Sequence, residues 1–478
     1  MSNQEETIKK RSEDFSKWYL DVIVAADLAD YAPVRGCIIF KPNGYAIWEN
    51  FQKVLDKKFK ETGHRNAYFP LLIPEEFLKK EAEHVEGFSP ELAVVTHAGG
   101  KELEEKLVIR PTSETIIYDS FSKWVHSWRD LPILINQWCN VMRWEKKTKP
   151  FLRTTEFLWQ EGHTAHETHD EAEKEALQML AVYADFAKDY LAIPVIKGVK
   201  SESEKFAGAL RTYTIEALMQ DGKALQSGTS HNLGQNFAKA FDIKFLDKNE
   251  EEQYVWQTSW GLSTRLIGGL IMTHGDDSGI IMPPKIAPLH LVFVPIWKEE
   301  SQREELSNKI NELKNTLPGD IISHTDDRDM RPGSKYYDWE RKGVPLRAEI
   351  GPRDLEQEQI ILARRDNGEK VVVKLNEFAK KVKELLESIQ ENLFKKAEKN
   401  LSDNTYEVKD WDDFQDTLTK NGGFIHANWC GSKECEAEIK EKTKATIRCI
   451  PLERGEKDGD CIHCKSEGKH KAYFAIAY

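Results

Sequence analysis

The sequence predicts a mixed α/β protein built from three successive parts. Helical and extended runs alternate over roughly the first 285 residues, and three prolines fall within MPPKIAP (282–288). After about residue 400, tryptophan, glycine and cysteine become more frequent. Closely spaced prolines suit a connection between domains better than the interior of a helix or strand. We therefore predict domains at 1–285, 286–398 and 399–478.

The composition limits the class of protein. The chain has 478 residues, of which 40% are hydrophobic and 31% charged, so it can form several packed cores. Its net charge of −12 argues against wholesale binding to nucleic acid but leaves room for a local basic face. The chain has neither an apolar run of membrane-spanning length nor a signal-peptide core. We expect a cytoplasmic protein, with no membrane contact and with reduced cysteines.

The first part alternates between helices and strands. Residues 45–60 place apolar side chains at helical spacing, and Gly63 suits the end of that helix. AYFPLLIP (67–74) is typical of a short extended run. A long amphipathic helix is predicted over 167–191, where an acidic first turn suits the positive end of the helix dipole.

The second part alternates strands and helices more regularly. This alternation is typical of a compact α/β domain with a substantially parallel sheet. The expected strands are 290–297, 319–325, 346–351 and 358–365, and the expected helices are 301–317 and 375–398.

Charged residues interrupt a predicted hairpin, QWCNVMRWEKKTKPFLRTTEFLWQEG (137–162). Arg143 and Glu145 would share one strand face, with Arg153 on the returning strand. Guanidinium groups suit a phosphate, and a carboxylate can accept a hydrogen bond from an amino group. A cross-strand ladder of ion pairs on a solvated face explains the same residues equally well.

Arg265 lies in the apolar, glycine-rich run GLSTRLIGGLIM. A helix with this sequence would be mostly buried, and a buried arginine without an anionic partner is costly. A phosphate or nucleotide would supply that partner. A structural ion pair with an acidic side chain is the alternative.

Four cysteines form two closely spaced pairs, C-x4-C and C-x2-C, which together predict a zinc site with four thiolate ligands. With all four positions filled, the zinc would be structural. The predicted ligands are Cys430, Cys435, Cys461 and Cys464. Cys37, Cys139 and Cys449 have no such pattern and are expected to be buried thiols.

Several of these runs resemble one known family. RWE with FLRTTEFLWQEG resembles motif 2 of the class II aminoacyl-tRNA synthetases, GLSTR resembles motif 3, and the helix 45–60 leading to Pro70 resembles motif 1. RPTSE (110–114), FLWQEGHTAH and SGTSHNLGQNF (227–237) resemble the prolyl-tRNA synthetases of the archaeal and eukaryotic-like type. The resemblance extends over essentially the whole chain, to its closing FAIAY.

The resemblance implies a fold and an activity. The first part would be a catalytic domain with an antiparallel sheet flanked by helices, followed by an α/β anticodon-binding domain and a small zinc-binding α/β module. The enzyme would attach L-proline to tRNA(Pro) with ATP in two steps, through prolyl-adenylate and with release of pyrophosphate. Mg²⁺ would accompany the ATP, and the motif 1 element would form a homodimer interface.

The resemblance also implies site residues. Arg143 and Arg265 would be catalytic. The proline site would contain Thr112, Glu114, Arg143, His231 and Trp159. The ATP site would contain Arg143, Glu145, Arg153, Thr154, Gln226, Thr229, Ser263 and Arg265.

Residues 333–354 interleave basic and aromatic side chains, as single-stranded RNA binding requires. Arg347 and Glu349 alternate onto one strand face and could read guanine edges, although a charged edge strand explains them equally well. By resemblance, Tyr478 would point toward the active site. The segment between motifs 2 and 3 leaves no room for a large editing domain.

Two other readings of the sequence differ in function. A synthetase-like paralogue could bind RNA without catalysis, but such proteins usually lose the motif 2 or motif 3 arginine. A class II enzyme for threonine would be expected to hold a metal in its catalytic domain, where the sequence shows no convincing ligand cluster.

Overall fold

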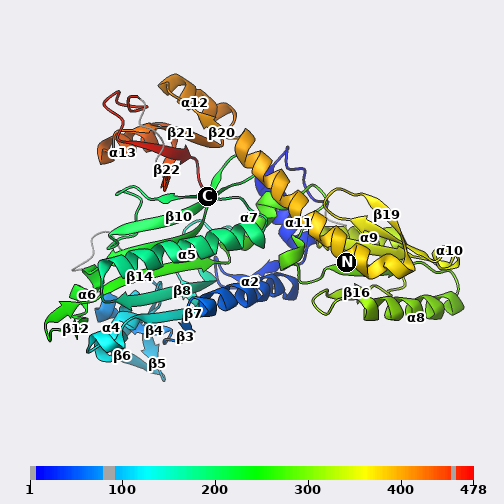
Figure 1. Ribbon diagram of the computed structural model, residues 1–478, viewed down its shortest axis with the longest axis horizontal. Coiled ribbons are helices and arrows are strands. Elements are labelled where there is room, and N and C mark those ends of the chain that lie inside the picture. Colours follow the sequence, from blue (N-terminus) through cyan, green and yellow to red (C-terminus); the bar gives the residue numbers. More distant parts are fainter. Residues whose placement is uncertain (1–6, 79–91, 454–458) are drawn as a thin grey trace.

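The computed structural model describes residues 7–78, 92–453 and 459–478 (Figure 1). A large sheet joins strands from the first and last parts of the chain, and a smaller sheet forms the middle part. The long helix α11 (Phe378–Asp403) runs from the middle part toward the last part (Figure 1).

The central strands of the large sheet pair antiparallel, which confirms the predicted architecture of the first part. Across the sheet, the strands are β20 (Thr405–Glu407), β21 (Phe424–Trp429), β23 (His470–Ala475), β22 (Thr446–Pro451), β9 (Ile196–Val199), β10 (Arg211–Leu218), β11 (Ala224–Gly234), β14 (Trp256–Ser263), β8 (Glu156–His166), β7 (Ile133–Met142) and β3 (Arg65–Asn66).

Helix α5 (His169–Asp189) lies across one face of this sheet (Figure 1). Thr168 and Glu171 form a capping box at its start, and a stripe that includes Met179 and Tyr183 is buried. The helix matches the prediction for 167–191. Helix α2 (Pro42–Glu61) likewise matches the prediction for 45–60, with Phe51 and Phe59 in the same core.

Other elements surround the large sheet. They are α1 (Phe15–Ala25), α4 (Glu114–Trp124), α6 (Asn236–Ala240), α7 (Arg265–His274), and three small sheets: β1 (Ala29–Tyr31) with β2 (Ile38–Phe40); β4 (Leu72–Pro74), β6 (Lys101–Ile109) and β5 (Val94–Ala98); and β12 (Lys244–Leu246) with β13 (Glu252–Tyr254). The structure describes all of residues 167–255, which lie between strands β8 and β14. The helices and strands of this segment either form the large sheet or surround it. No described helix is long and apolar enough to cross a membrane.

The middle part contains a mixed sheet with α8 (Glu300–Thr316), α9 (Pro332–Arg341), α10 (Pro352–Glu356) and α11 around it. Its strands, in order, are β16 (Ser323–Thr325), β15 (Leu291–Pro295), β17 (Leu346–Ile350), β18 (Gln359–Arg364) and β19 (Lys370–Lys374). The first three are parallel, as predicted, but β18 and β19 are antiparallel. The β18–β19 turn contains Gly368 at a φ of 74°, which permits a tight hairpin instead of a crossover helix.

The last part adds α12 (Trp411–Lys420) and α13 (Lys433–Thr443) to the strands β20 to β23. Its strand β22 pairs antiparallel with β9, where Ile450 lies opposite Val199. The sheet is therefore continuous between the catalytic part and the C-terminal part, and α13 and β22 lie near β10 in Figure 1.

Candidate active site

One face of the large sheet carries helix α5, and the opposite face lines a cavity of about 530 Å³. Side chains alternate in direction along a strand, so the two faces receive alternate residues. On β8, Gln160 points to α5, where it pairs with Tyr183, whereas Trp159 and Glu161 line the cavity. The residues predicted for both substrates meet here: Thr112, Glu114, Arg143, Glu145, Arg153, Thr154, Trp159, Gln226, Thr229, His231, Ser263 and Arg265.

An irregularity in β11 brings Gln226 to the cavity. Thr229 and His231 are two residues apart and share a face, but Gln226 has the other parity. Opposite Ile215 and Glu216 of β10, the register of β11 skips Ser227. This bulge returns Gln226 to the cavity side, where the motif resemblance had placed it, although strand alternation alone would not.

The charged hairpin residues lie beyond the strands, so their predicted placement on strand faces is wrong. Strand β7 ends at Met142 and β8 begins at Glu156, with Arg143, Glu145 and Arg153 in the connection. Pro150 and the turn at 150–152 end the ladder and let these side chains reach over the cavity. Glu145 and Arg153 form a half-exposed ion pair of 3.9 Å. The alternative of solvated ion pairs across the hairpin therefore holds for these two residues.

The guanidiniums of Arg143 and Arg265 line the cavity, and each is held by a backbone carbonyl. Arg143 donates through Nε to the Pro111 carbonyl at 3.0 Å and lies against the rings of Phe157 and Trp159. Arg265 donates through Nε to the Leu152 carbonyl at 3.1 Å. Within the described residues neither arginine forms an ion pair, which contradicts the structural ion pair considered for Arg265.

Burial lowers the pKa of both arginines, and nearby cations add to this effect at Arg265. Burial lowers the pKa of Arg143, and burial together with the cations Arg153 and Arg143 lowers the pKa of Arg265 to about 10. Both groups remain positively charged at neutral pH. Repulsion between cations in a poorly solvated cavity makes a polyanion such as a triphosphate a favourable occupant.

The opposite end of the cavity is smaller and partly apolar. Thr112 donates a hydrogen bond to Glu114, and both side chains are buried. A hydrogen bond of 2.9 Å joins Nδ1 of His231 to the hydroxyl of Thr212. Burial lowers the pKa of His231 to about 3, so this imidazole is neutral at physiological pH. A carboxylate beside apolar walls suits a small substrate with a cationic amine.

A buried carboxylate, Glu161, also belongs to this end, although the sequence analysis missed it. It accepts hydrogen bonds from Ser113, from Gln137 at 2.9 Å and from His163 at 3.1 Å. Burial raises the pKa of Glu161, but the hydrogen bonds from His163, Ser113 and Gln137 outweigh that effect and lower it. The sequence did contain a signal for Glu161: it lies two residues after Trp159 on the same predicted strand, so the two side chains share a face.

Glu114, Glu161 and His163 bring potential metal ligands within 4.8 Å of one another. The sequence did not reveal this group, because Glu114 is distant in the chain from Glu161 and His163 of strand β8. Their oxygen and nitrogen atoms already bond to Thr112, Ser113, Gln137 and one another, so the group is satisfied without a cation.

The four predicted cysteine ligands come together in the last part of the chain. Their sulfur atoms lie within 4.8 Å of one another, and Cys435 and Cys461 approach to 3.6 Å. A tetrahedral zinc–thiolate site with bonds near 2.3 Å places its sulfurs roughly 3.8 Å apart. The cluster therefore fits zinc. Of the other cysteines, Cys37 and Cys449 are buried as predicted, whereas Cys139 is half-buried and contacts Glu161 at 3.2 Å.

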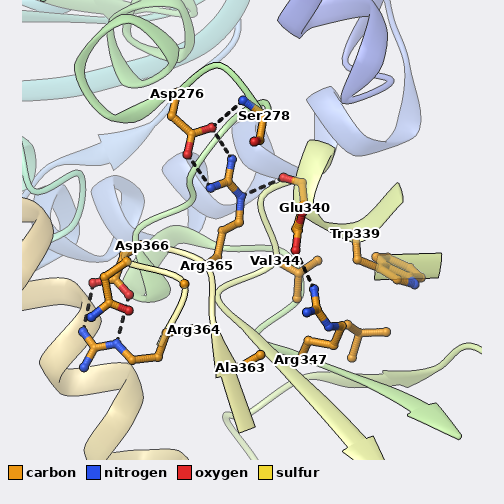
Figure 2. Close-up of a pocket in the computed structure, with 13 residues that line it drawn as sticks. Asp276, Ser278, Trp339, Glu340, Val344, Arg347, Ala363, Arg364, Arg365 and Asp366 are labelled. Atoms are coloured by element: carbon orange, nitrogen blue, oxygen red, sulfur yellow. Dashed lines mark hydrogen bonds and ion pairs between the residues drawn. The ribbon is translucent and has the colours of Figure 1, made fainter. Parts of the chain in front are cut away.

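A second cavity, of about 410 Å³, lies between the middle part and the end of α7 (Figure 2). Arg347 lines it, donating to Glu340 at 2.9 Å and to Glu349 at 3.0 Å. Figure 2 also shows Arg365 of this cavity paired with Asp276. Strand β17 is internal to its sheet, so the alternative of a charged edge strand is wrong.

Tyr478 lies beside the hairpin connection instead of lining the active-site cavity. Its hydroxyl donates to Asp221 at 2.6 Å, and its ring contacts the ammonium of Lys149. Lys149 also contacts the ring of Tyr19, whose hydroxyl donates to the Pro150 carbonyl. The KKTKP tip thus contacts helix α1 through Tyr19 and the C-terminal part through Tyr478.

Comparison with known proteins agrees with this arrangement. Residues 95–274 match the class II core domain of tRNA synthetases for G, H, P, S and T, and residues 290–385 match an anticodon-binding domain. The antiparallel sheet and its cavity define a class II aminoacyl-tRNA synthetase.

The remaining matches specify the family. Residues 411–478 match the C-terminal domain of prolyl-tRNA synthetase. The proline–tRNA ligase of Natranaerobius thermophilus is 55% identical over 100% of this chain and 99% of its own length. The enzyme of Alkaliphilus oremlandii is 56% identical over 99% and 98%, and that of Roseiflexus sp. is 54% identical over 99% of each. The chain belongs to the prolyl-tRNA synthetase family, which confirms the resemblance seen in its motifs.

Proposed function

We propose that this chain attaches L-proline to tRNA(Pro) in two ATP-dependent steps, through prolyl-adenylate and with release of pyrophosphate. The observation that carries the proposal is a cavity lined by two arginines that form no direct ion pair with the described residues, Arg143 and Arg265, and by the buried carboxylate of Glu114. A triphosphate suits the cations, and a cationic amine suits the carboxylate. Relatives of nearly identical length that are named proline–tRNA ligases support the choice of amino acid.

The first step needs no nucleophile from the protein. The carboxylate of proline attacks the α-phosphorus of ATP, an oxygen–phosphorus bond forms, and pyrophosphate leaves. Arg143 contacts the substrate carboxylate and the α-phosphate, and Arg265 contacts the γ-phosphate. These cations position the reactants and stabilise charge in the transition state. Mg²⁺ bound with ATP adds to that neutralisation.

The roles of the other cavity residues follow from their position. The proline site consists of Thr112, Glu114, Arg143, His231 and Trp159. The ATP site consists of Arg143, Glu145, Arg153, Thr154, Gln226, Thr229, Ser263 and Arg265. In the second step, the terminal ribose of the tRNA attacks the adenylate carbonyl and AMP leaves.

Recognition of the anticodon is the proposed role of the middle part. Arg347 borders a polar cavity next to Tyr336, whose ring lies 4.0 Å from its guanidinium carbon. Glu349 holds Arg347 from beneath. The guanidinium of Arg347 matches the acceptors of a guanine edge, whereas Glu349 does not line the cavity and supports Arg347 instead.

The wider organisation supports four further proposals. The chain divides into domains at 1–285, 286–398 and 399–478, zinc in the cysteine cluster is structural, and the enzyme acts in the cytoplasm. It forms a homodimer through the segment that resembles motif 1, where Tyr68 and Leu72 beside Pro70 are exposed.

Exchange of radiolabelled pyrophosphate into ATP tests the activity directly. We expect exchange that depends on proline and does not occur with threonine or alanine. Exchange with another amino acid in place of proline would refute the substrate assignment. Absence of exchange with every amino acid would favour a paralogue that binds RNA without catalysis.

A further inference from the structure

A short loop, 200–207, covers the amino-acid end of the active-site cavity. Lys200, Glu204, Lys205 and Phe206 line the cavity. The ring of Phe206 lies 4.7 Å from that of His231, and its backbone N–H donates to the same Thr212 hydroxyl that bonds His231. The position of Phe206 therefore shapes the space around the neutral imidazole.

Ser201 organises the fold of this loop. Its carbonyl accepts hydrogen bonds from the backbone N–H groups of Glu204 at 3.2 Å and Lys205 at 3.0 Å. Its hydroxyl points away from the turn and donates at 2.6 Å to Glu436, a residue of the C-terminal helix α13. Both side chains are buried. A shift of Ser201 would consequently move the turn that presents Phe206.

Helix α13 makes a second contact with the same loop. Lys440, one turn after Glu436, forms an ion pair of 3.2 Å with Glu204. Glu436 itself follows Cys435, so the cysteine cluster fixes the end of α13 from which these side chains project. The helix therefore meets the loop at two successive positions.

The base of the loop is rigid. Glu216 of β10 accepts hydrogen bonds from Lys200 at 2.7 Å and from Arg448 of β22 at 2.9 Å, and all three groups are buried. Because these ion pairs hold Lys200 in place, the contacts with α13 act on the turn at 201–206.

We propose that Glu436 is a positioning residue for the proline site: its bond to Ser201 sets the turn that holds Phe206 against His231. The inference rests on the function proposed above. Removing the acceptor leaves a buried hydroxyl without its partner and releases the turn. The consequence falls on the amino-acid end of the cavity, where the ring of Phe206 lies against that of His231.

Steady-state pyrophosphate exchange with the full-length zinc-containing protein tests this inference. For Glu436→Ala we expect the KM for proline to rise about tenfold, the usual effect of losing one hydrogen bond to a charged group. The KM for ATP, the zinc content and the melting temperature should stay close to wild type. Ser201→Ala should give a similar change, and the double variant should show no further increase.

Two variants of α13 serve as controls. Glu436→Gln retains an acceptor for Ser201 and should restore the KM for proline. Glu441→Ala removes an exposed carboxylate from the same helix and should have no effect. Lys440→Ala, at the surface contact with Glu204, should raise the KM for proline without affecting packing, and it replaces Glu436→Ala should that variant fail to fold.

The inference is wrong if Glu436→Ala matches Glu441→Ala, or if the KM for ATP rises as much as that for proline. Loss of zinc together with the rise would also refute it, because the effect would then be a general loss of structure. Wild-type exchange with a different amino acid would refute the proposed function alone. The same KM shift measured with that amino acid would still support the role of Glu436.

Discussion

At the scale of single residues, the decisive feature is a cavity lined by two arginines that form no direct ion pair with the described acidic side chains. Arg143 and Arg265 enter the same cavity, and each makes a hydrogen bond to a backbone carbonyl. A carbonyl holds a guanidinium in place without cancelling its charge. The remaining N–H groups stay directed to the substrate, as electrostatic stabilisation of a transition state requires.

Removal of either arginine should abolish most of the first step. We expect Arg143→Ala and Arg265→Ala each to lower kcat for proline-dependent pyrophosphate exchange by about 10²–10³-fold, the usual cost of losing one preorganised donor. Arg129→Ala, at an exposed position outside the cavity, is the matched control and should leave exchange unchanged. A variant of Arg143 with full activity would contradict the proposed mechanism.

At the scale of elements, helix α7 carries Arg265 close beneath the hairpin connection. A methyl group at Gly268 would come within 2.5 Å of the Leu152 side chain and 2.7 Å of the Tyr19 hydroxyl. Glycine is therefore required for the close approach that lets Arg265 reach the Leu152 carbonyl.

Substitution of Gly268 should displace Arg265 while leaving the helix intact. We expect Gly268→Ala to lower pyrophosphate exchange on the order of tenfold to a hundredfold, because small misplacements of catalytic groups are costly. Gly269→Ala is the control on the same helix, since its methyl group would meet only the flexible end of Leu225 at 2.9 Å. Equal activity of both variants would show that the close approach has no effect on catalysis.

The cysteine cluster joins the end of strand β21, the first turn of helix α13 and the segment before strand β23. Cys430 follows β21, Cys435 begins α13, and Cys461 and Cys464 lie in the segment before β23. Coordination energy contributes to folding in such small domains.

Loss of one ligand should therefore destabilise the C-terminal part. For Cys461→Ser we expect bound zinc to fall from about one ion per chain to nearly none and unfolding of this part to become easier by several kcal/mol. Elemental analysis and thermal melting measure the two effects. Cys37→Ser, at a buried cysteine outside the cluster, should keep its zinc. Unchanged melting and zinc content in Cys461→Ser would refute the four-cysteine site.

At the scale of the whole molecule, the large sheet links the catalytic and C-terminal parts. Because β22 pairs with β9, a chain ending near residue 400 would lose β20 to β23 and expose the edge of the sheet at β9. Metal in the catalytic part is therefore better tested in the full chain. Glu161→Gln should leave the zinc content unchanged if the cysteine cluster is the zinc site.

Buried neutral histidines should make the stability of the whole molecule depend on pH. Burial lowers the pKa values of His166 and His274 to about 4, below the ordinary 6.5. Below about pH 6.5 the unfolded chain binds protons that the folded chain excludes, so stability falls by up to about 1.4 kcal/mol per pH unit per histidine. This loss ends below the folded pKa.

Melting temperatures between about pH 7 and pH 5 should show this decline. His274→Gln keeps a donor for the Leu191 carbonyl, which His274 contacts at 2.7 Å, and should make the decline shallower. A melting temperature independent of pH over this range would contradict the neutral state of these histidines.

The sequence by itself determined the family, the order of the parts and the identity of most charged groups. Long motifs in the sequence are enough to determine these features, because residue type and spacing are local properties of the chain. Helices such as α2 and α5 were predictable for the same reason, since their apolar periodicity and capping residues are close together in the chain.

Only the tertiary structure decided how these groups meet. The bulge at Ser227, the loop position of Arg143 and the approach of Glu114 to Glu161 and His163 depend on how distant strands pair and where they end. The contact of Ser201 with Glu436 spans 235 residues of chain. Neither register nor such long-range contacts are encoded in local spacing, because they arise when distant segments compete for the same buried surface.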